Sequence, residues 1–500
     1  MKKTQSLKLS RVVLMLAVSS LAACSVTPEP FDKRSLVRFA DELRNTVVSD
    51  QEALNGPIDL YQAMARALKY NLDKRVEMMT VALRQGDLRA EEWNMLPRLV
   101  ASVGYDGRNN YNGSSSQSLV NPLLPRSDPS TSSEKSSITA DLTASWDILD
   151  YGLSYARANQ AADEVLIAQE RKRKVVVRII EDVRTAYWRA ISSERLIKEL
   201  VALEGSIKGA LAKSRKTSND QVSSPLKALN YQRELMQMQQ ESQRLHRELK
   251  LAKFQLAALM NLEPGIDFEL AMPNRRNQAP KISVDRDVMM SRALQDRPEL
   301  REVGYQKRIN EHEARAAYLK MLPSVKGFVG INYDSNDFLY RNNWVGWGAR
   351  ASWNLLNVFS YGDSKAVVDA QDALLDARAK AMAMAVMTQV EVSVARFEHL
   401  RGELNTARKY HDTQRAILDK IRASHKAGRV SQQTFIRERM NTVVSDVKYD
   451  IANADLQNAY ANLYASVGAD PFSPDLKGDE SVAKMAKALK TLWESRESAQ

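Results

Sequence analysis

A duplicated pattern constrains the fold of this chain more than any other feature of its sequence. Leu96-Pro97 recurs as Leu322-Pro323, 226 positions later (322 − 96), and Trp146 recurs as Trp353, 207 positions later (353 − 146). The matched landmarks keep the same order in both halves, so the chain carries one structural unit written twice. The smaller second spacing means that the first copy has a longer loop, over 107–135, which is rich in Ser, Asn and Pro.

Each copy is predicted to fold as helix, strand, loop, strand, helix, turn and helix. The strands are expected near 99–106 and 138–146 in the first copy and near 325–333 and 344–353 in the second. In these stretches apolar and polar residues alternate, which is the period of a β-strand. Taken alone, the alternation favours a half-buried soluble sheet, although a barrel wall between lipid and water has the same pattern.

Two very long helical stretches dominate the rest of the two copies. Residues 155–213 contain no Pro and would span about 90 Å as a helix at 1.5 Å per residue. Residues 365–426 form a second such run. Apolar residues recur near the coiled-coil period, as in Val176, Ile180 and Val183. We therefore expect these stripes to pack against neighbouring helices rather than to line a cofactor site.

The repeat also sets the expected domain organisation. The first structural repeat covers 58–265 and the second covers 284–471, with a linker over 266–283 between them. An N-terminal segment over 24–57 precedes the repeats. The tail over 472–500 is predicted to be a polar, partly helical extension, and the sequence assigns no role to it.

The N-terminus is typical of an exported lipoprotein. Basic residues precede a short apolar run over 12–18, which is too short to span a membrane as a helix. The motif Leu21-Ala22-Ala23-Cys24 reads as a lipobox, and Cys24 is the only cysteine of the chain. We expect cleavage of the signal peptide 1–23 and acylation of Cys24, with palmitate among the acyl chains. An ordinary secretory signal followed by a chance cysteine is the alternative.

Charge and residue chemistry argue against an enzyme and against nucleic acid as a partner. The formal net charge is +11, and loss of the four cations of the signal leaves +7 (11 − 4). An exported chain with this charge is expected to meet anionic lipid or acidic partners. The five histidines lack metal-ligand spacing, and no phosphate-binding glycine motif is present. We therefore predict no catalytic residues, no cofactor and no metal.

Four strands are too few to close a membrane barrel, for which about eight is the usual minimum. Each orphan polar group of an unpaired edge in lipid costs several kcal/mol. If these strands enter a membrane, several chains must therefore share one barrel. Two chains would supply eight strands and a filled interior, whereas three would supply twelve strands and leave a lumen.

The order and duplication of several short motifs resemble the TolC-type outer-membrane factor family, also called outer membrane efflux proteins. The resemblance covers about 58–471. It is carried by the two Leu-Pro junctions already described and by three further motifs: Trp146-Asp147-Ile148-Leu149-Asp150, Trp353-Asn354-Leu355-Leu356-Asn357, and Arg297-Pro298-Glu299-Leu300, which is similar to the family's Asn-Pro-Glu-Leu.

The resemblance implies a fold that is mainly α with a small β part. Duplicated helix–strand–strand–helix units would build long coiled-coil helices into a periplasmic tunnel, and four strands would join a transmembrane β-barrel shared by a homotrimer. The implied function is the outer-membrane channel of a tripartite export system for efflux or type I secretion. Its implied partners are a periplasmic adaptor (membrane fusion) protein, an inner-membrane pump of the RND or ABC type, and outer-membrane lipid. A lipid-anchored periplasmic coiled-coil scaffold without a pore is the alternative.

The resemblance places adaptor docking at the two periplasmic helix turns. Gly428 is expected to adopt positive φ at a helix end, and Ser431 is expected to cap the next helix. Plain turn chemistry would explain both turns equally well. The docking residues are predicted to be Asn219, Asp220, Val222 and Ser223 in the first turn and Gly428, Arg429, Val430 and Ser431 in the second.

The sequence departs from the family pattern at the expected channel constriction. Some family members carry acidic residues six and nine positions after the turn glycine, where this chain has Thr434 and Arg437. We therefore expect an entrance that lacks an acidic ring and conducts anions at least as well as cations. Pairing of Arg437 with Glu438 or Asp446 is the alternative interpretation.

Overall fold

The structure is a computed structural model of the 500-residue chain. It separates into two compact units, Met1–Ala53 and Leu54–Gln500, and each unit is described by itself. The residues that the structure describes are 28–49, 51–219, 225–273, 282, 285–469 and 480–498.

The described residues of the first unit, 28–49 and 51–53, include the amphipathic helix α2 (Lys33–Thr46). Asp32 caps its N-terminus and accepts a hydrogen bond from a backbone N–H of the first turn at 2.8 Å. Leu36 and Leu43 lie on the same face of the helix, and both are exposed.

The helices of the second unit divide between the two copies of the repeat. The first copy contains α3 (Leu60–Tyr70), α4 (Leu72–Trp93), α5 (Ile148–Asn219) and α6 (Pro225–Leu259). The second copy contains α7 (Arg286–Asp296), α8 (Pro298–Lys320), α9 (Leu356–Lys426) and α10 (Gln432–Ser466), and α11 (Val482–Ser498) follows it. Within the described ranges, none of the helices combines the length and the apolar character needed to cross a lipid bilayer.

Matched elements keep the spacings seen in the sequence. Both ends of α7 lie 226 positions after those of α3, and both ends of α10 lie 207 positions after those of α6. The turn after α6 contains Asn261 with φ 55°, and the matched position after α10 is Gly468 with φ 74°. The indole N–H of Trp146 donates to the carbonyl just before the first Leu-Pro pair at 3.3 Å, and that of Trp353 does the same in the second copy at 3.0 Å. The predicted duplicated, mainly α fold with a small β part is confirmed.

The strands form a four-stranded antiparallel sheet in the order β1-β4-β5-β6. The strands of this sheet are β1 (Arg98–Gly107), β4 (Ser136–Asp147), β5 (Ser324–Asp334) and β6 (Asn343–Ser352), while β2 (Gly113–Ser114) pairs with β3 (Ser130–Thr131) in the long loop. Arg98 pairs with Ser145 in the first hairpin, and their matched residues Ser324 and Ser352 pair in the second. The duplication therefore extends to the strand register.

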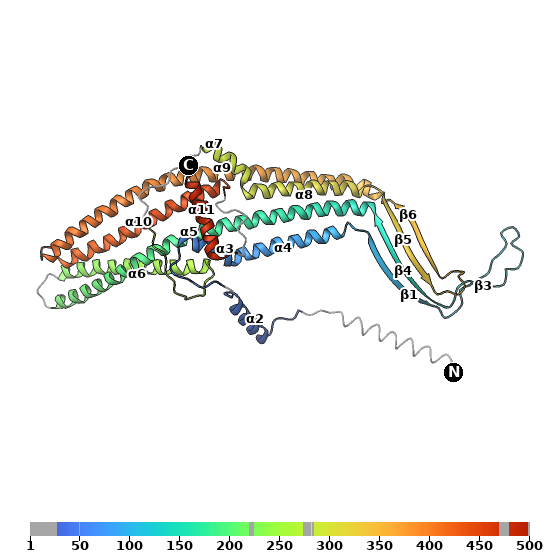
Figure 1. Cartoon of the computed structure of the whole chain (residues 1–500), viewed down its shortest axis with the longest axis horizontal. Helices are drawn as coiled ribbons and strands as arrows, with labels where there is room; N and C mark the ends of the chain where they lie inside the picture. The colour runs from blue at the N-terminus through green and yellow to red at the C-terminus, as the bar shows by residue number, and fades with distance from the viewer. Residues whose placement is uncertain are drawn as a thin grey trace. The chain divides into compact units, whose positions relative to one another are not determined.

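Four helices continue from the sheet in the same lateral order as the strands. α4 is joined to β1, α5 to β4, α8 to β5 and α9 to β6. Along this row α4 packs on α5, α5 packs on α8, and α8 packs on α9. Figure 1 shows the helices extending from one end of the sheet, with the C-terminal end of α5 and the α9–α10 turn at the far end. The unit is thus an ordered row with two open sides, one at α4–β1 and one at α9–β6.

Within the C-terminal segment over 472–500, the structure describes residues 480–498, which contain α11 and an apolar helix face that the sequence analysis did not single out. Its helix α11 packs against α3, and Met485 and Leu489 are buried in the same apolar cluster as Met64 of α3. Trp493 continues this face one turn further and is also buried. Because these residues recur at helical spacing, α11 has an apolar face that the overall polarity of the tail concealed.

Candidate functional site

One face of the sheet carries rows of exposed apolar side chains. Paired residues of an antiparallel sheet project to the same face, so the register aligns these rows across the strands. In Figure 1 the helices continue beyond the strand ends and do not cover this face. The rows are Leu99–Ala144–Val329–Trp347 and Ala101–Leu142–Ile331–Val345, and their bulky members are exposed.

The opposite face of the sheet has mostly small or polar residues, together with the larger apolar side chains of Val100, Phe328 and Trp344. Asp141 lies between Ser102 of β1 and Asn332 of β5. The hydroxyl of Ser102 donates to the carboxylate of Asp141 at 2.5 Å. A sheet with one exposed apolar face and one polar face is the wall expected between lipid and water. The outer strands β1 and β6 each have a strand partner on one side only within the described residues.

The α9–α10 turn is closed by two backbone hydrogen bonds. Gly428 adopts φ 70°, and its N–H donates to the carbonyl of His425 at 3.0 Å. The N–H of Arg429 donates to the carbonyl of Ser424 at 2.9 Å, so the last carbonyls of α9 are satisfied by a Schellman motif. Ser431 then caps α10 by accepting a hydrogen bond from the N–H of Thr434 at 3.2 Å. Positive φ at Gly428 and the cap at Ser431 were both expected.

An aromatic contact braces the same turn. Nδ1 of His425 lies 2.9 Å from the carbonyl oxygen of Val430, and the imidazole stacks on the ring of Phe435 with centroids 4.9 Å apart. Arg429 is exposed beside this contact. The turn therefore presents one cation on a rigid support.

Arg437 is engaged by acidic residues of both copies of the repeat. Its Nη1 lies 3.2 Å from Oε1 of Glu234 on α6, and its Nε lies 3.7 Å from Oε1 of Glu438. Gln433 donates to the other oxygen of Glu234 at 2.7 Å. The sequence analysis offered Glu438 and Asp446 as alternative partners of Arg437. The structure pairs Arg437 with Glu438, whereas Asp446 contacts His411 and Arg415. Glu234, which the sequence analysis did not single out, links α10 of the second copy to α6 of the first.

The remaining predicted site residues are described only in part or not at all. Asn219 is the last residue of α5. Asp220, Val222 and Ser223 lie outside the described residues, as does Cys24 together with the signal peptide.

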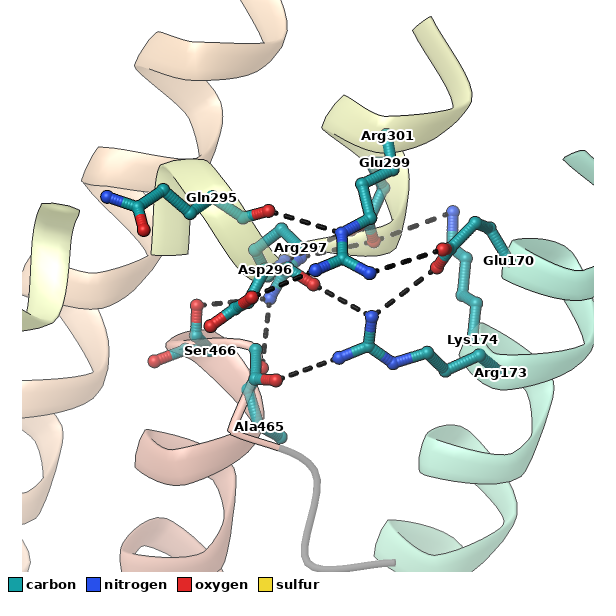
Figure 2. A network of polar contacts seen from close by, with 11 residues as sticks. Glu170, Arg173, Lys174, Gln295, Asp296, Arg297, Glu299, Arg301, Ala465 and Ser466 are labelled. Carbon is teal, nitrogen blue, oxygen red and sulfur yellow. Dashed lines mark hydrogen bonds and ion pairs between the residues drawn. The ribbon is translucent and has the colours of Figure 1, made fainter. Parts of the chain in front are cut away.

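A polar network joins the two copies near the middle of the unit. Arg173 of α5 donates to the carbonyl of Asp296 at 2.9 Å and to that of Gly468 at 2.8 Å. Asp296 is the last residue of α7, and Gly468 lies in the turn after α10. Arg297 forms a bidentate pair with Glu299 at 3.0 and 3.1 Å. Figure 2 shows Arg173 reaching from α5 into the corner where α7, α8 and α10 meet. Cations placed at helix C-terminal carbonyls are favourable.

The first copy has a smaller version of this network. Arg297 also donates to the carbonyl of Ser466 at 3.5 Å, and the matched Asn71 donates to the matched carbonyl of Leu259 at 3.4 Å. The Asn71 side chain in addition caps α4. The Arg-Pro-Glu-Leu motif quoted from the sequence therefore marks a joint between helix ends, and its role is structural.

A polar cluster around the buried Asp446, between α9 and α10, was missed by the sequence analysis. His411 Nε2 lies 2.7 Å from Asp446 Oδ1, and Arg415 Nη2 lies 3.3 Å from Asp446 Oδ2. His411 lies seventeen positions before Gly428, and Asp446 lies seventeen positions after Arg429. Because α9 and α10 run antiparallel from this turn, their equal distances from it would have predicted that the two residues face one another. In the described part of the chain, no group of three or more His, Cys, Asp or Glu residues is placed to hold a metal ion.

Comparison with known proteins supports the resemblance read from the sequence. Residues 64–262 match the family model described as outer membrane efflux protein, which spans the first copy from α3 to the turn after α6. No curated protein sequence matches the chain.

Three solved structures that are similar in fold are described as outer-membrane channels. The OprN channel superposes with a TM-score of 0.63 at 14% identity, covering 82% of this chain and 90% of OprN. The CmeC channel of Campylobacter jejuni superposes with a TM-score of 0.64 at 11% identity, covering 94% and 97%. The MtrE channel of Neisseria gonorrhoeae, solved in its open state, gives 0.61 at 16% identity, covering 82% and 88%. The predicted resemblance is confirmed, and it is a resemblance to channels and not to enzymes.

Proposed function

We propose that this chain, which has the fold of outer-membrane channels and the outer membrane efflux protein signature over 64–262, is the outer-membrane component of a tripartite export system. Three copies form a passive duct. A periplasmic adaptor binds the duct, and an inner-membrane pump of the RND or ABC type supplies both cargo and energy. The choice between efflux and type I secretion therefore lies with the pump.

The observation that carries this proposal is the exposed apolar face of the sheet between two open edges. Exposed apolar area is stabilised in lipid by about 25 cal/mol per Å² relative to water. An edge strand in lipid is unfavourable because each orphan backbone group costs several kcal/mol. When three copies join their strands into a twelve-stranded barrel with a lumen, the apolar face contacts lipid and the edge strands gain partners.

The helices extend the duct away from the membrane. α4, α5, α8 and α9 leave the sheet side by side, and the α5–α6 and α9–α10 hairpins lie furthest from it. The braced turn from Gly428 to Ser431 is our proposed docking site for the adaptor, with the exposed Arg429 as its charged contact. The first turn, which includes Asn219, is the second docking site.

Lipid anchoring completes the proposed location in the outer membrane. Removal of the signal peptide 1–23 leaves acylated Cys24 as the first residue. The anchor would hold the N-terminal segment at the periplasmic side of the outer membrane.

Ion selectivity follows from the constriction residues. The entrance has Thr434 and Arg437 in place of two carboxylates, and we propose that it conducts anions at least as well as cations. Glu234 offsets part of the Arg437 charge, so Glu234→Gln should shift the reversal potential in a KCl gradient further toward that of Cl⁻. Strong cation selectivity of the unmodified channel would refute this part of the proposal.

The decisive experiment is extraction and bilayer recording of the mature chain. We expect trimers that need detergent, dissociate on heating and conduct ions. The Cys24→Ala variant is the control for anchoring, because a strand-borne membrane protein still requires detergent without its acyl chains. A variant that becomes a water-soluble, non-conducting protein would instead identify a lipid-anchored scaffold.

A further inference from the structure

Two cations lie directly opposite one another on the polar face of the second hairpin. Lys326 of β5 pairs with Arg350 of β6, and both residues are exposed. Both positions are close to the end of the sheet that joins α8 and α9. Like charges at directly opposed positions destabilise an antiparallel pair, so the presence of these two cations needs an explanation.

Neighbouring carboxylates do not neutralise this pair. Within the described ranges, neither Lys326 nor Arg350 forms an ion pair at 4.0 Å or less. The adjoining strand β4 carries Asp147 opposite Lys326. The Asp147 carboxylate accepts hydrogen bonds from two backbone N–H groups in the first turn of α5 at 2.9 and 3.2 Å, and from the hydroxyl of Ser324. Because Asp147 is engaged in capping a helix, the pair keeps an excess of positive charge.

The first copy of the repeat forms the same hairpin without these charges. The offsets map Lys326 onto Val100 (326 − 226) and Arg350 onto Thr143 (350 − 207). Val100 and Thr143 pair in the first hairpin, as Lys326 and Arg350 pair in the second. Folding of the hairpin therefore does not require the two cations, which are specific to the second copy.

An exposed aromatic ring adjoins the two cations on the same face. Phe328 lies two positions after Lys326, pairs with Gly348 and is 39% exposed. A Cβ at position 348 would lie 2.9 Å from Cζ of Phe328, so the ring occupies space that only glycine leaves open. The matched residues of the first copy are Ser102 and Asp141. The ring, like the cations, is therefore specific to the second copy.

We propose that Lys326, Arg350 and Phe328 form a binding site for organic anions in the lumen of the barrel, and that the exported cargo includes anions with an apolar ring beside the charged group. The inference rests on the proposed function, in which the polar face of the sheet lines the lumen. The Arg350 guanidinium can bind a carboxylate, sulfonate or phosphate through two parallel hydrogen bonds, and the Lys326 ammonium adds a point charge. The Phe328 ring covers the apolar part of the same molecule.

The proposed assembly places three such sites at one height in the lumen. Threefold symmetry gives the three Lys326–Arg350 pairs equal height, and the duplicated register puts the uncharged Val100–Thr143 pairs between them at a matching height. Cations that line a narrow passage raise the local concentration of anions. The three sites would therefore concentrate anionic cargo where the helical tunnel opens into the barrel.

Bilayer recording of the mature full-length chain with two tetravalent anions tests the site. Pyrene tetrasulfonate carries its charges on an aromatic ring system, whereas ferrocyanide carries the same charge without one. Each probe is added on the side of the strand loops, so that it reaches the barrel before the helix turns, and the bilayer is phosphatidylcholine, so that no anionic lipid contributes. We expect both probes to block the current, and pyrene tetrasulfonate to do so at about tenfold lower concentration because its rings contact Phe328.

Substitutions copied from the first copy separate the contributions. Arg350→Thr should raise the half-blocking concentration of both probes by about tenfold or more, because it removes a charge-assisted contact. Phe328→Ser should weaken block by pyrene tetrasulfonate only. Val100→Lys with Thr143→Arg builds the cation pair in the first hairpin and should strengthen block by both probes. The matched control is Arg341→Thr, which removes an exposed arginine from the loop between β5 and β6 and should leave block unchanged.

The outcomes separate this site from the channel itself. A conducting channel that neither probe blocks, or block that Arg350→Thr leaves unchanged, would overturn the site while leaving the proposed channel function intact. If Arg350→Thr fails to assemble as trimers, the variant with Val100→Lys and Thr143→Arg still decides, because unchanged block there contradicts the site. Absence of conductance in the unmodified protein would overturn the proposed function itself.

Discussion

Replacing Trp493 by alanine should detach α11 from the body of the second unit. The Trp493 indole is 7% exposed and meets the ring of Tyr460 edge-on, with centroids 5.8 Å apart. On its other side the guanidinium of Arg184 lies 4.0 Å from the indole centroid. The indole therefore joins α11 to both α5 and α10 at a single point.

The expected loss is large for one side chain. Truncation of a buried tryptophan to alanine costs about 3–5 kcal/mol. Loss of the cation–π contact with Arg184 adds roughly 0.5–2 kcal/mol. Because each 1.4 kcal/mol changes an equilibrium constant tenfold, this loss of about 3.5–7 kcal/mol should make local opening of α11 roughly 300- to 100,000-fold more frequent.

Hydrogen exchange of the detergent-solubilised protein measures this opening directly. Amides of α11 should exchange faster by the same factor in Trp493→Ala, and a protease should remove the C-terminal segment. Lys490→Ala, at an exposed position of the same helix, should change stability by less than about 0.5 kcal/mol. Unchanged exchange of α11 in Trp493→Ala would show that the helix is held by something other than its apolar face.

Three further predictions concern the long helices. Gly428→Ala should destabilise the α9–α10 turn by about 1 kcal/mol, because Gly428 has positive φ. Gly402→Ala, inside α9, should stabilise the protein by a similar amount. The thermal unfolding temperatures of the two variants should therefore shift in opposite directions. Burial raises the pKa of Glu181, with the nearby Asp182 adding to the shift, so its charged form costs stability. Glu181→Gln should therefore stabilise the protein at neutral pH, and the gain should vanish as the pH falls below the ordinary glutamate pKa of about 4.3 in melting curves against pH. Asp446→Ala should cost about 1–3 kcal/mol because it removes the buried carboxylate that contacts the buried imidazole of His411, and denaturant unfolding that matches the unmodified protein would contradict that role.

Features that repeat locally along the chain could be predicted from the sequence. The alternation of the strands and the long Pro-free runs each involve residues that are close in sequence, and the offsets of 226 and 207 positions follow from comparing short motifs along the chain. Backbone requirements were equally local, as Gly428 and Ser431 illustrate, because a Schellman turn and an N-cap are each completed within a few residues. These features were sufficient for the fold class and for the order of helices and strands along the chain.

Contacts between distant segments were decided only by the tertiary structure. The partnership of Arg437 with Glu234 joins positions about 200 apart, and nothing near Arg437 distinguished Glu234 from Asp446. The docking of α11 depends on an apolar face whose complement lies on α3, near the other end of the chain. Sequence periodicity specifies which face of a helix is apolar, but the choice of the surface that covers it depends on which elements the fold brings together. That choice is a property of three-dimensional packing, because burial is favourable against any surface of fitting shape.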